Sequence, residues 1–113
     1  MGWTQPKPLS AAEPVARNVG LAILSTVRDW NGRIPPSSVA GILRGDEASA
    51  ICWNYGPARF PQFGALKNLP SRGITRSIEL LVLKGLLRKE TKSHSSRSAT
   101  VLWMTEAGQA ALS

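Results

Sequence analysis

The feature of this sequence that most constrains its fold is a helical segment followed at once by two strand-forming segments. The run LPSRGITRSIELLVLKG (69–85) has a helix start at Pro70 and Ser71 and a stop at Gly85. Its apolar residues form one stripe at helical spacing: Ile74, Ile78, Leu81 and Val82. Residues 86–91 and 99–104 are predicted to be the strands of a hairpin, joined by a loop of seven polar residues, 92–98. A helix must therefore lie directly beside a projecting hairpin.

Two more helices are predicted upstream of this unit. The first begins at a capping box, in which the Ser10 side chain accepts a hydrogen bond from the Glu13 backbone and the Glu13 side chain reaches back. Its apolar face recurs at helical spacing and comprises Val15, Val19, Ala22, Ile23, Val27 and Trp30. The dipeptide Asn31-Gly32 is predicted to end this helix.

The second upstream helix is predicted within IPPSSVAGILRGDE (34–47) and is short. The two prolines fix an extended approach, Ser37 or Ser38 caps the helix, and Gly45 ends it. Its apolar positions are Val39, Ile42 and Leu43. Residues 46–62 are predicted to form an irregular connection with a helical turn after Asp46.

The order of these elements defines the fold class. Three helices, a hairpin and a final short helix capped by Thr105 are the layout of a winged helix-turn-helix, mainly α with a small β-hairpin. The third helix is then the one presented to nucleic acid, and the hairpin is the wing. We expect one domain at residues 10–113, preceded by a linker or flexible N-terminal tail at residues 1–9.

The charge of the chain indicates what it binds. Its 14 Lys and Arg residues against 7 Asp and Glu residues give a formal net charge of +7. From Lys67 onward there are eight basic and three acidic residues, so this half carries +5 of the +7. Such a balance favours nucleic acid first and an anionic membrane surface second. No uncharged run approaches the roughly 20 residues of a membrane span, so we expect DNA and no membrane partner.

Several classes of function are excluded or disfavoured. One cysteine and one histidine cannot assemble a structural zinc site from the usual ligands, so no metal is expected. The opening MGWTQPKPLS lacks the apolar region of a secretory signal. No paired carboxylates or Ser, His and Asp set indicates catalysis, and we expect no catalytic residue.

Basic residues of the third helix are the first candidates for phosphate contacts. Arg72 and Arg76 lie one turn apart on the face opposite the apolar stripe. Glu79 lies on the same face and could pair with Arg76. Arg44 has three interpretations, since it could contact phosphate, neutralise Asp46 or interact with the C-terminal dipole of its own helix.

Four segments resemble a known family in order and spacing. They are ILRG (42–45), FGAL (63–66), ITRSIELLVLKGLL (74–87) and LWMTEAGQAAL (102–112). Over about residues 15–112 the chain is similar to the RQC winged-helix domain of RecQ-type DNA helicases. The Leu-Arg-Gly with the aromatic-Gly pair downstream is the more specific part, whereas Gly-Leu and Leu-Thr-Glu occur in many winged helices.

The resemblance implies an accessory domain of a helicase with a role in DNA replication, repair or recombination. The chain lacks the four-cysteine zinc module and any GxxxxGK[ST] phosphate loop, so the motor is expected elsewhere in a parent chain. That motor would use ATP and Mg²⁺, and this chain needs no cofactor. The chain also departs from the family where Asp46 and Glu47 follow the Leu-Arg-Gly, because acids there repel phosphates.

The implied DNA-binding residues come from both parts of the winged helix. They are Arg44, Lys67, Ser71, Arg72, Thr75 and Arg76 around the third helix, and Lys92, His94 and Arg97 on the wing. His94 is the only ring in the predicted loop, so it either wedges a duplex apart, as an aromatic residue does in several RecQ-type domains, or faces solvent.

Two other functions are compatible with the sequence. A free-standing transcription regulator would read a palindrome as a dimer, whereas we expect a monomer. A protein-interaction module would dock through the third helix, and exposure of Leu80 and Leu83 would favour it. We expect a cytoplasmic, nucleoid-associated bacterial protein.

Overall fold

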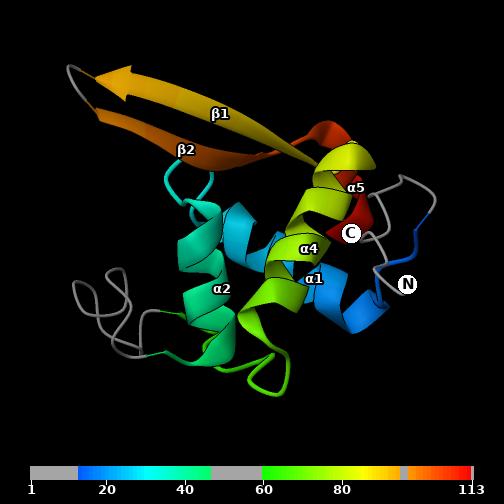
Figure 1. Cartoon of the computed structure of the whole chain (residues 1–113). Coiled ribbons are helices and arrows are strands. Elements are labelled where there is room, and N and C mark those ends of the chain that lie inside the picture. The colour runs from blue at the N-terminus through cyan, green and yellow to red at the C-terminus, as the bar shows by residue number, and fades with distance from the viewer. Residues whose placement is uncertain (1–12, 47–59, 95–96, 113) are drawn as a thin grey trace, which may run out of the picture.

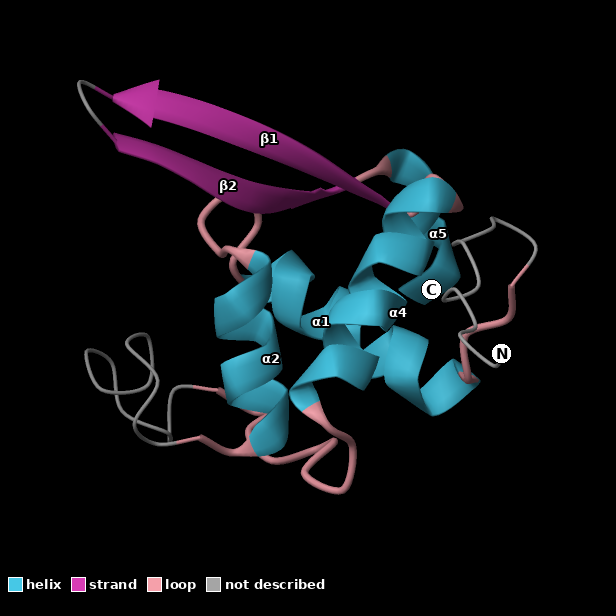
Figure 2. Cartoon of the chain, in the orientation of Figure 1, coloured by secondary structure: helices cyan, strands magenta, loops and turns pink. Residues whose placement is uncertain are grey.

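The computed structural model describes residues 13–46, 60–94 and 97–112 of the chain. Its elements are α1 (Arg17–Asp29), α2 (Pro36–Arg44), α4 (Ser71–Leu83), β1 (Leu87–His94), β2 (Arg97–Met104) and α5 (Glu106–Leu112). The helices gather into one cluster, and the hairpin crosses one end of it and projects beyond α2 (Figures 1 and 2). This arrangement confirms the mainly α winged-helix class.

The core forms where α1 packs against α2, α4, α5 and β2. The predicted apolar stripes of the three helices face it, and its fully buried large side chains are Ile23, Ile34, Ile42, Leu43, Ile74, Ile78, Leu87, Leu102, Val27 and Val39. Burying one such side chain stabilises a fold by about 1.5–3 kcal/mol. Burial of these stripes therefore fixes which face of α4 points outward.

The capping box predicted for the first helix is wrong. Helix α1 begins at Arg17 after Ala16, and no side chain caps it. Glu13 lies four residues before Arg17, outside the helix, so its carboxylate cannot act as the third helical residue. That carboxylate instead binds Arg76 of α4. Ser10 lies outside the described residues.

Helix α2 begins two residues earlier than a cap at Ser37 would place it. Pro35 is the extended cap residue and Pro36 is the first helical residue, so Ser37 and Ser38 lie inside the first turn. A proline fits this position because the first N–H groups of a helix have no partner within it. The predicted stop is confirmed, since Gly45 has a left-handed conformation (φ 74°).

The segment between α2 and α4 is described from residue 60 onward. Phe60 is buried, and its ring centroid lies 5.3 Å from that of Trp30. The helical turn predicted after Asp46 falls on residues 47–59, which lie outside the described residues.

The strands of the wing are longer than predicted. Strand β1 runs to His94 and β2 starts at Arg97, in an antiparallel register that pairs Leu87 with Met104 and His94 with Arg97. Most of the predicted seven-residue loop is therefore strand. The tip of a two-stranded ribbon has no core to cover, so its residues are polar on both faces and lack the alternation that marks a half-buried strand.

The chain just after α1 holds the base of the wing. Gly32 donates to the Leu102 carbonyl (2.8 Å), and Leu102 donates to the Ile34 carbonyl (2.9 Å). The Asn31 side chain also accepts from the Met104 backbone (2.6 Å). These bonds extend the sheet by a short edge segment, and they fix the direction in which the hairpin leaves the core.

Thr105 joins the ends of two helices. Its hydroxyl donates to the Gly85 carbonyl after α4 (2.6 Å) and accepts from Gly108 in the first turn of α5 (3.1 Å). The predicted cap is confirmed. It ties α5 to the end of α4 at the point where the wing begins.

Candidate nucleic-acid interface

The Leu-Arg-Gly and aromatic-Gly motifs form one structural unit. Gly45 and Gly64 both have positive φ (74° and 76°), and a β-carbon on Gly45 would lie 3.2 Å from the Gly64 α-carbon. Gly64 donates to the Ile42 carbonyl and Leu66 to the Leu43 carbonyl, both at 2.8 Å. The two glycines permit this close approach, which fixes the turn leading from α2 to α4.

This turn brings Arg44 to the N-terminus of α4. The Arg44 guanidinium donates to the Ser71 hydroxyl (3.3 Å). The two residues line a hollow of about 360 Å³ together with Gly41, Gly45 and Asp46. The cap residue of α4 is Pro70, whose side chain has no group that could cap the helix. The positive end of the helix dipole and an arginine therefore converge on one polar hollow.

The other predicted residues at this end of α4 are accessible. Lys67, Ser71, Arg72 and Thr75 are all exposed. Lys67 precedes the helix by one turn, Arg72 lies in its first turn, and Thr75 lies one turn further along the same outward side. The structure joins Arg44 to Ser71 at this helix end, and Lys67, Arg72 and Thr75 lie within four residues of Ser71 along the chain. We name this group the helix-end cluster.

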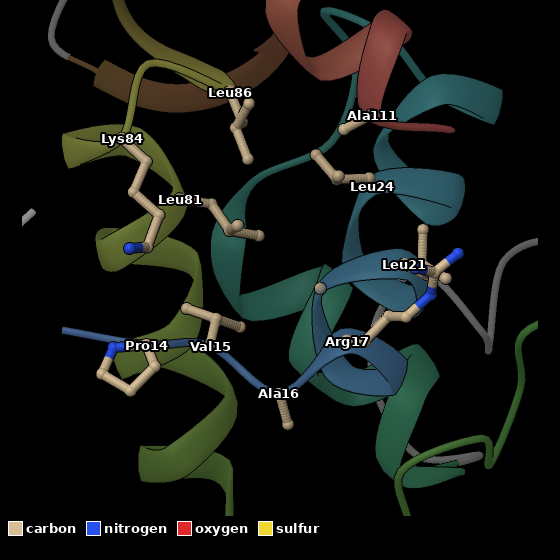
Figure 3. A pocket seen from close by; sticks show the side chains of 11 residues that line it. Pro14, Val15, Ala16, Arg17, Leu21, Leu24, Leu81, Lys84, Leu86 and Ala111 are labelled. Carbon is tan, nitrogen blue, oxygen red and sulfur yellow. The ribbon is translucent and has the colours of Figure 1, made fainter. Parts of the chain in front are cut away.

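Arg76 of α4 has an ion-pair partner that was not predicted from the sequence. Its guanidinium donates to both carboxylate oxygens of Glu13, with the shortest contact at 2.8 Å. The residues before α1 cross α4, with Pro14 and Val15 beside an apolar hollow of about 380 Å³ between α1, α4 and α5, and Glu13 thereby reaches Arg76 (Figure 3). A bidentate carboxylate compensates the arginine charge. Arg76 is thus not an open phosphate contact in this structure.

Glu79 also has a partner other than the one considered from the sequence. It binds the Lys89 ammonium of β1 through both oxygens at 2.9 Å rather than Arg76. Two ion pairs therefore compensate the charges of the middle of the outward face of α4. The open positive charge of α4 is confined to its first turn.

The wing residues are placed by their backbone. Lys92 pairs in register with Ala99, and His94 pairs with Arg97. The side chains of residues 92–98 lie outside the described residues, so the phosphate contacts of Lys92 and Arg97 and the wedge role of His94 stay predictions. Since β1 starts after the C-terminal end of α4, the wing and the helix-end cluster lie at opposite ends of that helix (Figure 1).

One pair of residues on the wing was missed in the sequence. The Arg88 guanidinium carbon lies 5.6 Å from the centroid of the Trp103 ring, a cation–π contact. Arg88 and Trp103 are directly opposite in the register. A hairpin alignment from the sequence could have found the pair, but only with the strands extended so that His94 pairs with Arg97.

Cutting the Glu13 contact is expected to strengthen DNA binding. Glu13→Gln removes the charge that compensates Arg76, and a freed guanidinium can bind one more phosphate. We expect the affinity to rise about fivefold, and the slope of log K against log[salt] to steepen by about 0.9. Fluorescence anisotropy with labelled duplex measures both.

The double variant Glu13→Gln/Arg76→Gln is the control, and it should bind like the wild type. A fall in affinity with Glu13→Gln would mean that Glu13 holds Arg76 in the conformation that binds DNA.

The fold and this cluster define a winged-helix domain with a basic surface at the start of its third helix. The family model of the RQC domain matches residues 19–113 of the chain. The chain therefore belongs to the RQC domain family, the C-terminal domain of RecQ proteins, as the resemblance predicted. Membership supports a RecQ-associated accessory role in DNA binding. The comparison with curated proteins finds no match.

Two further observations concern metal ions and membranes. Among the described residues, no group of three or more His, Cys, Asp or Glu side chains could hold a metal ion. No helix in the described part of the chain is long and apolar enough to cross a membrane.

Proposed function

We propose that this chain is the DNA-binding accessory domain of a RecQ-like helicase and that it grips duplex or forked DNA beside the unwinding junction. The helix-end cluster holds one backbone segment. The wing, through Lys92, Arg97 and His94, reaches the adjacent strand or the fork.

The observation that carries this proposal is the hydrogen bond from Arg44 to Ser71 at the uncapped start of α4. It holds a guanidinium beside backbone N–H groups that have no partner within the helix, an arrangement suited to a phosphate oxygen. Arg72 and Lys67 add two exposed cations near the same end of the helix. Asp46 lines the same hollow, and its negative charge restricts phosphate contacts to the side formed by Arg44 and Ser71.

Contacts of this type position a protein on DNA without reading bases. We therefore expect binding that tolerates changes of sequence, depends on DNA structure and weakens with salt. The parent chain supplies the motor with its ATP and Mg²⁺, and the domain works as a monomer on bacterial nucleoid DNA in the cytoplasm.

The direct test compares DNA structures. Forked DNA should be bound about threefold to tenfold more tightly than a plain duplex of the same sequence. The fork gives the wing an additional segment of DNA backbone to contact. Two duplexes of unrelated sequence should differ less than about twofold. Anisotropy titrations provide both ratios. A strong preference for one palindrome, with a dimer in sedimentation, would contradict the proposal and favour a transcription regulator.

A second candidate function rests on Leu83. Its side chain is 49% exposed at the end of α4, the one large apolar side chain of the described residues that is so exposed. Leu80, the other residue expected to be exposed in a protein-interaction module, is buried. One exposed leucine is too small for a stable interface by itself, so the DNA function is favoured.

A further inference from the structure

We propose that the wing binds phosphate with its outward face, centred on Arg88, and so holds a backbone segment of the DNA separate from the one at the helix-end cluster. This inference rests on the proposed DNA-binding function and deepens it, since it assigns the face of the wing and a contact residue outside the predicted set.

The register separates the two faces of the wing. Residues that lie directly opposite in an antiparallel pair share a face, and neighbours along a strand alternate. Leu87 and Leu102 are buried, and Lys89, opposite Leu102, reaches Glu79 of α4. These residues define the inward face. Arg88 and Trp103 belong to the other, outward face.

Trp103 holds Arg88 in place. The indole ring lies against Gly32, where an added β-carbon would overlap the ring atoms. Gly32 has φ 74° and its backbone is bonded to β2, so this support is fixed. The cation–π contact attracts the guanidinium to the face of this fixed ring. It orders a side chain that is still 59% exposed, so its N–H groups stay accessible to a phosphate.

The two faces of the wing differ in how far their positive charges are compensated by nearby carboxylates. On the inward face, Lys89 is compensated by Glu79. On the outward face, the ion pair that Arg88 forms within the described part of the wing is a long contact of 3.8 Å with Glu90. The register also assigns positions 92, 94 and 97 to the face of Arg88. The basic positions of the wing other than Lys89 therefore share one face, and that face is continuous with Arg88 at its base.

Adjacent residues of equal charge provide the test. Arg88→Gln and Lys89→Gln each remove one positive charge from β1, on opposite faces. Arg88→Gln should weaken binding to forked DNA about fivefold and lower the magnitude of the salt slope by about 0.9. Lys89→Gln should change the affinity less than about twofold. Thermal melts by circular dichroism compare the folding of both variants with that of the wild type.

Variants of Trp103 test its positioning role. Trp103→Leu should reproduce part of the loss, Trp103→Tyr should retain binding, and Arg88→Gln/Trp103→Leu should bind no worse than Arg88→Gln alone. If the wild type binds forked DNA and the two β1 variants lose the same amount, or Arg88→Gln loses nothing, the outward-face assignment is overturned. If the wild type binds no DNA at low salt, the proposed function itself fails.

Discussion

Charge reversal at Arg72 is expected to lower the affinity for forked DNA about 30-fold at roughly 100 mM salt, the sum of about 1 kcal/mol for a lost phosphate contact and about 1 kcal/mol for new repulsion. Arg72 lies in the first turn of α4, directly after Ser71, which the Arg44 guanidinium contacts. A carboxylate there opposes the field of the helix-end cluster at its centre. Anisotropy titration of Arg72→Glu measures the loss.

The matched control is Arg17→Glu, which changes the net charge of the chain by the same amount. Arg17 is exposed at the N-terminal end of α1 and does not belong to the helix-end cluster. The affinity of this variant for forked DNA should fall less than about threefold, because salt screens the interaction between a distant charge and the DNA. Equal losses for the two variants would show that binding follows total charge and has no defined site.

Gly108→Ala is expected to destabilise the fold by about 2 kcal/mol or more, although alanine is normally the better helix former by about 1 kcal/mol. Gly108 lies in the first turn of α5, and a β-carbon there would overlap the Leu86 carbonyl oxygen. That oxygen belongs to the backbone at the base of the wing and accepts from Thr105, so it has little freedom to move. Urea denaturation followed by circular dichroism measures the change.

Ala110→Gly is the companion variant, since Ala110 is exposed on the same helix. It should cost about 1 kcal/mol through helix propensity alone. A Gly108→Ala variant more stable than the wild type would show that α5 does not pack on Leu86 as described.

The helices and their stops were predictable because each rests on a local signal. The stripe of α4 has helical spacing from Ile74 to Leu81, and Gly45 and Gly85 adopt the left-handed conformations that end their helices. Thr105 was predictable for the same reason, as a cap acts within one turn. Local chemistry decides these features before tertiary contacts form.

The misplaced features depend on contacts between distant residues. Glu13 fits a capping box locally, but a guanidinium 63 positions away takes its carboxylate. Glu79 could reach Arg76 along the helix, yet Lys89 approaches from the wing. The sequence shows which residues are charged but not which of them form ion pairs. The predicted phosphate role of Arg76 depends on its ion-pair partner.

The wing was located correctly but given the wrong length. Alternation of apolar and polar residues identifies a strand only where one face is buried, as for Leu87 and Leu102. Beyond Thr91 and Thr100, whose hydroxyls lie 3.2 Å apart, the ribbon leaves the core and the pattern stops. A polar segment next to a strand is therefore compatible with a longer hairpin as well as with a loop.

The most direct test of the proposed DNA contacts is the salt dependence of DNA binding by the unmodified chain. We expect log K to fall linearly with log[salt], with a slope of about −4 to −5 for four to six phosphate contacts made by the helix-end cluster and the wing together. Arg72→Ala and Arg88→Gln should each lower the magnitude of the slope by about 0.9, whereas Arg17→Ala should leave it unchanged. A flat salt dependence, or no binding at low salt, would contradict the proposed contacts.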